Sequence, residues 1–203
     1  MTETASRVRI VALGDSTTAG TPGFESPLES PPSGRGDVTS QYAYWLMQMH
    51  PEWEVLNKGV NGERSDQISA RFERDVVGEK PAIVVIIAGV NDVYQGRPAA
   101  HVIEQLEWMY RRGRETGIRM IAGTIVPFNT ATPEQNASMR TVNSWILRQA
   151  IPGLLETVDT RAAVAAPRNP DRLSETADQL HPSPAGYRAM ADAIRRGVEH
   201  ILL

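Results

Sequence analysis

Cysteine is absent from the 203-residue sequence. Its absence excludes disulfide bonds, a thiol nucleophile and metal sites built on thiolates. Any nucleophilic or metal chemistry in this chain must therefore use oxygen and nitrogen side chains.

A strong charge of either sign is missing as well. The chain has 21 Lys and Arg against 24 Asp and Glu, a formal net charge of -3. This balance indicates neither a nucleic-acid-binding surface nor one that grips an anionic membrane. The only dense basic spot comprises Arg111, Arg112 and Arg114, near the end of a predicted helix, where positive charge suits the helix dipole.

Long apolar runs are also lacking. The opening segment, MTETASRVRIVALG, has no apolar core of signal-peptide length before the first predicted strand. No run approaches the length of a transmembrane helix. We therefore expect a cytoplasmic location without stable membrane association, although a chain trimmed of its leader would have the same sequence.

The residues that are present describe a globular chain. Hydrophobic residues make up 41% of the sequence and charged residues 22%. With no internal repeat or linker in evidence, we expect one domain over residues 1–203.

Short β-rich runs alternate with longer amphipathic segments. Such alternation predicts right-handed crossovers and a mostly parallel sheet covered by helices on both faces. The run AIVVIIAG is apolar on both faces, as a central parallel strand must be. The five predicted strands are 9–13, 54–60, 82–89, 120–127 and 154–160.

Two helix starts carry capping signals. Thr132 is placed as an N-cap, with Pro133 at the first helical position and Gln135 reaching back in a capping box. Ser183 and Pro184 repeat the cap-and-proline pattern before the last amphipathic segment. These signals predict that helices begin near residues 133 and 184.

Polar or glycine-rich motifs follow the predicted strands. In parallel sheets of this kind, ligands bind outside the carboxyl ends of the strands. The topology therefore brings the motifs to one rim, and this convergence is more informative than any single motif. They are GDS after the first strand, NKGVNGE after the second, GVND after the third and DQLHPSPAG before the last helix.

Ser16 is the first candidate for chemistry. It follows the first strand directly, where a hydroxyl would be displayed at the sheet edge. A serine hydroxyl is a poor nucleophile until a neighbouring base takes its proton. For an isolated Gly-Asp-Ser, a turn or a helix cap is the stronger interpretation.

His181 is the one histidine predicted to lie in a loop. Asp178 precedes it by three positions, and a carboxylate on the same turn can fix the tautomer and leave the other ring nitrogen as a base. The alternative is that Asp178 forms a local turn and His181 is merely exposed. A metal site at this pair is a weaker interpretation, because no third and fourth ligands have persuasive spacing.

Asn91 and Gly62 are candidates for holding developing negative charge. Asn91 follows the central strand, where an amide N–H can be aimed at an oxyanion, although an Asn-Asp turn is the alternative. Gly62 precedes a predicted helix and can expose backbone N–H groups, with Gly59 as a rival for this role.

Taken together, the four motifs resemble the SGNH hydrolase superfamily, also called the GDSL esterase/lipase family. The resemblance runs from GDSTTAG to DQLHPSPAGY and so covers nearly the whole chain. Four modest motifs in the right order, each at a strand end, make a specific signal. It implies a flavodoxin-like α/β/α sandwich with a five-stranded, mostly parallel sheet.

The resemblance also implies ester hydrolysis through an acyl-enzyme, without metal or organic cofactor. Ser16 corresponds to the nucleophile, His181 to the base and Asp178 to its orienting carboxylate. The implied oxyanion donors are the backbone N–H groups of Ser16 and Gly62 and the side chain of Asn91. Asp15 and Asp92 are expected to support the loops of the site.

The substrate is left open by the sequence. The resemblance favours small acyl esters or O-acetylated carbohydrates, with lysophospholipase or thioesterase activity, or a non-catalytic binding module on the same fold, as alternatives. Aromatic residues form only 6% of the chain, so composition offers no obvious sugar-stacking platform, but one Tyr or Trp in a loop would suffice. The oligomeric state is not predicted.

The segment 21–37 is long and rich in proline, and it follows Ser16 closely. Loops of this length are usually functional or disordered. We expect it to flank the pocket and to place Phe24 and Leu28 against the substrate, with a floppy insertion as the alternative.

Overall fold

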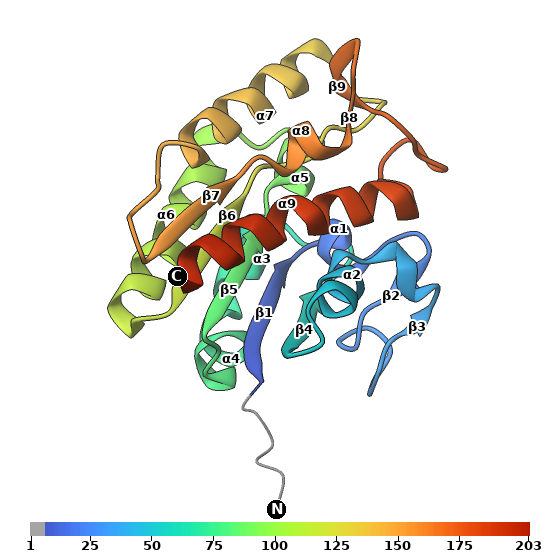
Figure 1. The fold of residues 1–203 in the computed structure, drawn as a ribbon. Coiled ribbons are helices and arrows are strands. Elements are labelled where there is room, and N and C mark those ends of the chain that lie inside the picture. The colour runs from blue at the N-terminus through green and yellow to red at the C-terminus, as the bar shows by residue number, and fades with distance from the viewer. Residues whose placement is uncertain (1–6) are drawn as a thin grey trace, which may run out of the picture.

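A parallel five-stranded sheet forms the centre of the protein (Figure 1). The computed structural model describes residues 7–203; residues 1–6, part of the segment in which no leader is expected, lie outside the described chain. The strand order is β4-β1-β5-β6-β7, which is the flavodoxin-like order. The strands are β1 Val8–Gly14, β4 Trp53–Gly59, β5 Ile83–Ile87, β6 Arg119–Gly123 and β7 Leu155–Val158.

Burial along each strand follows its place in the sheet. All five residues of the central strand β5 are buried, as its continuous apolar run predicts. Residues of β4 alternate between buried and half-buried, because this strand is at the edge and only one of its faces is fully covered. The edge position explains why its sequence is the least strand-like of the five.

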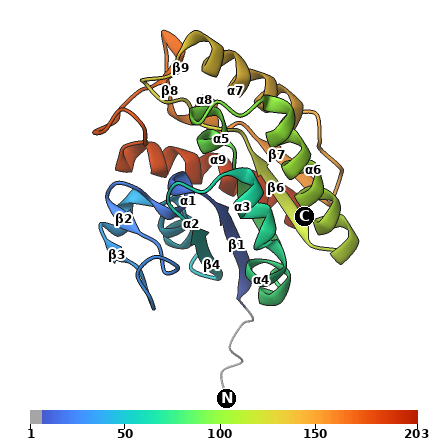
Figure 2. The same ribbon diagram turned by 180° about the vertical axis from the view of Figure 1, so that it is seen from behind.

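Helices cover both faces of the sheet. The helices α2 (Tyr42–Met49) and α9 (Pro184–Leu202) lie across one face (Figure 1), and α3 (Ser65–Ala70), α6 (Ala99–Thr116) and α7 (Pro133–Ile146) cover the other (Figure 2). The predicted three-layer sandwich is confirmed.

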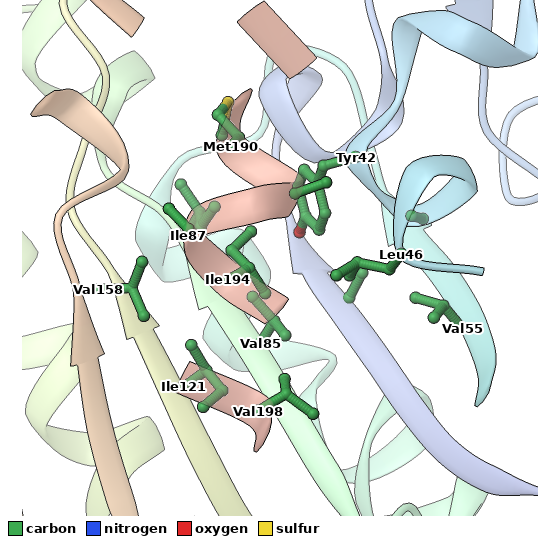
Figure 3. Packing of buried hydrophobic residues seen from close by; sticks show 14 of the residues in the cluster. Tyr42, Leu46, Val55, Val85, Ile87, Ile121, Val158, Met190, Ile194 and Val198 are labelled. Atoms are coloured by element: carbon green, nitrogen blue, oxygen red, sulfur yellow. The ribbon is translucent and has the colours of Figure 1, made fainter. Parts of the chain in front are cut away.

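Each face of the sheet has its own hydrophobic core. On the α9 side, Ile194 and Val198 of the helix pack over Val85 and Ile121 of the sheet (Figure 3). These four side chains are fully buried. Burial of such side chains stabilises the fold by about 1.5–3 kcal/mol each, which fixes α9 and the loop that precedes it.

Both capping predictions are confirmed. The Gln135 backbone N–H donates to Thr132 Oγ1 at 3.3 Å, and the Thr132 N–H donates to Gln135 Oε1 at 2.9 Å, which completes the capping box. The Gly186 N–H donates to Ser183 Oγ at 3.2 Å at the start of α9.

Several elements are shorter than the sequence pattern predicts. The fourth predicted strand ends at Gly123 and the fifth at Val158, where Asp159 caps the short helix α8 (Thr160–Val164). The segment after β4 forms α3, α4 (Phe72–Asp75) and a 3-10 turn, η2 (Val77–Glu79), in place of one helix.

Other short elements have no counterpart in the pattern. Two are single-turn helices, α1 and α5, which directly follow strands of the sheet. The rest are another 3-10 turn and two small antiparallel ladders. Their bounds are α1 Ser16–Ala19, α5 Val90–Tyr94, η1 Val38–Ser40, β2 Phe24–Glu25, β3 Arg35–Gly36, β8 Ala165–Ala166 and β9 Asn169–Leu173.

No helix within residues 7–203 is long and apolar enough to cross a membrane.

The basic spot on α6 forms ion pairs with neighbouring acidic residues. Arg112 pairs with Glu73 and Glu115, and Arg111 lies 3.9 Å from Glu115. Two of the three arginines in this spot are thus paired with carboxylates of the same protein.

Candidate active site

Ser16 is the first residue of the single-turn helix α1, at the end of β1. Asp15 caps this helix by accepting the Thr17 backbone N–H at 2.9 Å. A Cβ atom at Gly14 would lie 2.4 Å from the carbonyl oxygen of Ile87, so only glycine permits this sharp turn from strand to helix. As the first helical residue, Ser16 has a backbone N–H without an intrahelical partner.

Asp178 and His181 form a tight polar turn just before α9. Asp178 Oδ1 accepts the backbone N–H groups of Leu180 and His181, each at 2.9 Å. Its Oδ2 lies 2.6 Å from His181 Nδ1. Burial raises the pKa of Asp178. The hydrogen bonds from His181 and from the two backbone N–H groups have a larger effect in the opposite direction, and the pKa is lowered to about 2.

His181 connects this turn to Ser16. Its Nε2 lies 2.8 Å from Ser16 Oγ, so Asp178, His181 and Ser16 form one continuous chain of hydrogen bonds. Ser16 is 4% exposed, and the His181 side chain is 12% exposed. Such a chain can move a proton from the hydroxyl to the imidazole while the carboxylate holds the ring.

Asn91 lies in α5, the single-turn helix after β5. Gly89, with a φ of 119°, precedes it in the left-handed conformation and turns the chain sharply out of the strand. Asn91 Nδ2 donates to the Glu63 carbonyl oxygen at 2.9 Å. An amide group has two N–H donors. The Glu63 carbonyl therefore orients the Asn91 side chain and leaves its second N–H for another acceptor.

The two candidate glycines have different surroundings. The Gly59 N–H donates to Asn57 Oδ1 at 2.9 Å, and a Cβ atom at Gly59 would lie 2.1 Å from the Ala19 nitrogen. Gly59 thus serves the close packing of β4 against α1, and its N–H is occupied. Gly62 lies in an exposed turn with a φ of 76° and nothing within 4 Å of an added Cβ atom.

Asp92 joins the two loops that follow β4 and β5. It is fully buried, and its carboxylate accepts the Ser65 backbone N–H at 2.7 Å and the Ser65 hydroxyl at 2.9 Å. These bonds hold α5 against the start of α3. The position of Asn91 relative to the Gly62 turn is therefore fixed by its neighbour in the sequence.

Asp15 is buried behind the serine. Its Oδ2 has no hydrogen-bond partner within the described residues. Burial raises the pKa of Asp15 to about 7, and the nearby Asp92 carboxylate adds to the increase. Hydrogen bonds from Thr17 and the charge of Arg71 act in the opposite direction but are weaker.

Arg71 is a site residue that the sequence pattern did not indicate. Its buried guanidinium donates to the Gly14 carbonyl at 2.9 Å, to Glu63 at 2.7 Å and to Asp75 at 2.9 Å. It thus joins the end of β1 to the loop after β4. Its spacing of four from Asp75, beside the apolar stripe of this segment, is the signal that could have revealed it.

A family model described as the GDSL-like lipase/acylhydrolase family matches residues 12–189. The chain belongs to this family. An acetylxylan esterase from Geobacillus stearothermophilus is 30% identical over 192 residues, covering 82% of this chain and 86% of the relative. The predicted membership of the SGNH hydrolases is confirmed, and the chain is a carboxylic ester hydrolase.

Solved structures show the same fold. The structure of Axe2, an acetylxylan esterase from Geobacillus stearothermophilus, superposes with a TM-score of 0.69 and 25% identity, covering 97% of this chain and 96% of the other. A lipase/acylhydrolase from Enterococcus faecalis has a TM-score of 0.72 and 24% identity, covering 94% and 95%.

In this GDSL-family chain, a pocket of about 170 Å³ opens at the serine. No Lys, Arg, Asp or Glu is found among the described residues that line it. Two of the lining aromatic residues, Tyr94 and Phe128, were not predicted from sequence. Gly62 is not part of the lining, but its neighbour Asn61 is. The lining residues are Ser16, Thr17, Asn61, Val90, Asn91, Tyr94, Phe128, Leu180 and His181.

The expectation that Phe24 and Leu28 of segment 21–37 contact the substrate in this pocket is wrong. Phe24 and Leu28 line a separate cavity of about 460 Å³ between the segment and α2. The segment is fixed against the edge strand instead, where Ser26 Oγ donates to the Gly59 carbonyl at 2.6 Å. Glu29 accepts the Asn61 N–H at 2.7 Å. These bonds direct Phe24 and Leu28 away from the site, while Glu29 contacts Asn61 at the rim of the pocket.

Two groups of side chains in the GDSL-family fold combine His with Asp, residue types that can ligate a metal. His181 is unsuited, because both of its ring nitrogens are engaged by Asp178 and Ser16. A second group, Asp66, Asp92 and His101, has ligand atoms within 4.8 Å of one another. The Asp66 carboxylate is already paired with Arg64 at 3.0 Å, and both Asp92 oxygens accept from Ser65. We therefore assign no metal to either group.

Proposed function

We propose that this chain hydrolyses short acyl esters of neutral alcohols, O-acetylated carbohydrates first among them, with Ser16 as nucleophile. The observation that carries the proposal is the hydrogen-bonded chain from Asp178 through His181 to Ser16, which ends in a small uncharged pocket. The reaction requires no metal or organic cofactor.

In the first half-reaction, Ser16 Oγ attacks the acyl carbonyl while its proton moves to His181 Nε2. The Asp178 carboxylate stabilises the resulting imidazolium, and its pKa of about 2 keeps it ionised at neutral pH. The tetrahedral intermediate then collapses, the ester C–O bond breaks, and His181 returns the proton to the leaving alcohol. Water attacks the acyl-enzyme by the same route and releases the acid.

The oxyanion of the intermediate requires preorganised donors. We assign the backbone N–H of Ser16, the backbone N–H of Gly62 and the second N–H of Asn91. Asn91 and Ser16 line the same pocket, whereas Gly62 adjoins it next to Asn61. Each such donor is worth about 2.7–4 kcal/mol of transition-state stabilisation.

Two features of the pocket support a small, neutral substrate. Its volume of about 170 Å³ is below the ~300–1,000 Å³ typical of pockets for drug-sized ligands, which favours a short acyl group. Its lining carries no Lys or Arg to meet the phosphate of a lysophospholipid or of an acyl-coenzyme A. The acetylxylan esterase relative supports a sugar alcohol.

The assignment is tested by covalent labelling. We expect a fluorophosphonate to modify Ser16, as mapped by mass spectrometry, and pre-incubation with phenyl acetate to slow the labelling. Ser16→Ala abolishes labelling and ester hydrolysis, whereas Ser33→Ala, at an exposed serine in the 21–37 segment, retains both.

The choice of substrate is tested by comparing acetyl, butyryl and octanoyl esters with acetylated xylo-oligosaccharides and palmitoyl-coenzyme A. A preference for acetyl groups supports the proposal. Labelling of another serine contradicts the mechanism, and faster turnover of palmitoyl-coenzyme A contradicts the substrate class.

A further inference from the structure

Tyr94 is an exposed aromatic residue at the catalytic pocket. Four large hydrophobic side chains are exposed within residues 7–203: Val38, Tyr94, Leu147 and Leu203. Of these four, Tyr94 lines the catalytic pocket, and it is 55% exposed. An exposed ring beside the proposed nucleophile is available to contact a ligand.

Tyr94 is held in place at its backbone by Gln135 and at its ring by Phe128. Tyr94 is the last residue of α5, and Gln135 Nε2 from α7 donates to the carbonyl oxygens of Val93 at 3.4 Å and Tyr94 at 3.3 Å. The ring centroid lies 5.7 Å from that of Phe128, at an angle of 60° between the planes. Phe128 is only 2% exposed, so it supports Tyr94 from the core.

The groups near Tyr94 select the chemistry of its partner. The pocket combines this ring with the amide of Asn61, which is exposed at the same rim, and with no acidic or basic side chain except the imidazole of His181. An apolar ring face suits the C–H groups of a sugar, and a neutral amide suits its hydroxyl groups. A phosphate or an ammonium group would find no opposite charge here.

We propose that Tyr94 binds the alcohol half of the substrate by stacking on the sugar ring that carries the acetyl group, and that Asn61 hydrogen-bonds to a neighbouring hydroxyl. This inference rests on the proposed function, because Ser16 must be the attacked position for Tyr94 to lie beside the alcohol. Tyr94 thereby determines preference for saccharides over simple esters, while the triad determines the rate of the chemical step.

The inference is tested by comparing an acetylated xylo-oligosaccharide with ethyl acetate, which has the same acyl group but no ring. Tyr94→Ala should raise KM for the saccharide, so that its kcat/KM falls on the order of tenfold more than that for ethyl acetate. Tyr94→Phe should restore most of the saccharide preference, because it keeps the ring. Tyr44→Ala, at a tyrosine that lines the separate cavity beside α2, should change neither value.

Binding without turnover provides a second measurement. Calorimetric titration of the Ser16→Ala variant with the acetylated saccharide should give an affinity that falls on the order of tenfold when Tyr94→Ala is added. Equal losses on the saccharide and on ethyl acetate, or no loss on either, would overturn the inference. Fluorophosphonate labelling of Ser16 in the Tyr94→Ala variant is measured separately. If Ser16 is labelled normally but the saccharide preference does not change, this inference is rejected and the proposed function is unaffected.

Discussion

A carboxylate partner alone does not distinguish the histidine proposed as base. His50 and His200 each have a ring nitrogen 2.7 Å from a carboxylate oxygen, and His181 has one at 2.6 Å. His181 differs because its second nitrogen meets the hydroxyl of Ser16. Its position between the Asp178 carboxylate and a hydroxyl that lines the pocket is what makes the residue suitable for proton transfer.

Asn91→Ala tests the side-chain oxyanion donor. We expect kcat to fall on the order of a hundred- to thousand-fold, because one donor to the developing charge is lost. Steady-state kinetics on phenyl acetate measure the effect, and circular dichroism establishes whether the variant is folded, since the bond to the Glu63 carbonyl is lost too. Asn169→Ala, at an exposed asparagine in β9, is the control. A folded Asn91→Ala variant with near-normal kcat would show that Asn91 only shapes the turn.

Residues near the ends of strands could be foreseen from the sequence, because topology alone brings these positions together. Ser16 and Asn91 were found in this way, and they line one pocket. Tyr94 could not be foreseen, and Arg71 has only its spacing of four from Asp75 as a signal. Each reaches the site through the packing of its helix, and single-sequence periodicity does not say which neighbour a side chain contacts.

Two substitutions distinguish the roles of Gly59, the last residue of β4, and Gly62, in the turn that follows it. Gly59→Ala would place Cβ 2.1 Å from the Ala19 nitrogen, and this contact is with backbone, so α1 must move. We expect a loss of about 1–3 kcal/mol in the free energy of unfolding and reduced activity, because α1 carries Ser16. In Gly62→Ala, the added Cβ atom has no neighbour within 4 Å, and the backbone N–H is retained. Only the strain of an alanine at a positive φ should lower the free energy of unfolding, by about 1–2 kcal/mol.

Urea unfolding and kcat measured together distinguish the two sites. We expect Gly62→Ala to retain a larger share of wild-type kcat than Gly59→Ala. The reverse order would show that β4 tolerates a side chain against α1 and that the conformation of the exposed turn governs catalysis.

Long elements follow the sequence pattern, and very short ones do not. The buried strand β5 and the capped helices α7 and α9 carry strong local signals, and all three are present. The single-turn helices α1 and α5 form where the chain turns sharply at the end of a strand. These turns are imposed by contacts between segments that are distant in the sequence. The ladder of β2 and β3 pairs two residues on each side, too few for any periodicity to reveal.

At the scale of the whole molecule, Asp15 makes stability depend on pH. Its pKa is raised from 3.8 to about 7, first by burial and then by the charge of Asp92. The native state therefore keeps a proton that the unfolded chain loses, so the contribution to stability is present at low pH and is lost as pH rises through about 7.

Asp15→Asn should remove this dependence, since the amide cannot ionise and its Oδ1 can still cap α1. We expect the free energy of unfolding of the wild type to fall by about 3 kcal/mol relative to the variant between about pH 5 and about pH 8. Urea unfolding at both pH values measures the difference. Asp66→Asn, at a half-buried aspartate paired with Arg64, is the comparison. Parallel curves for wild type and Asp15→Asn would show that Asp15 does not change protonation in this range.

The proposed nucleophile and its base are 165 residues apart in the chain. A ribosome makes the N-terminal part first, so β1 and the serine at its tip emerge long before the turn that holds the histidine. That turn takes its place only when α9 packs on the sheet. By the proposed mechanism, a nascent chain with most of its strands still has no base, and ester cleavage begins only after translation has passed the last helix. In the proposed mechanism, the emergence and packing of α9 is thus the step that activates the enzyme.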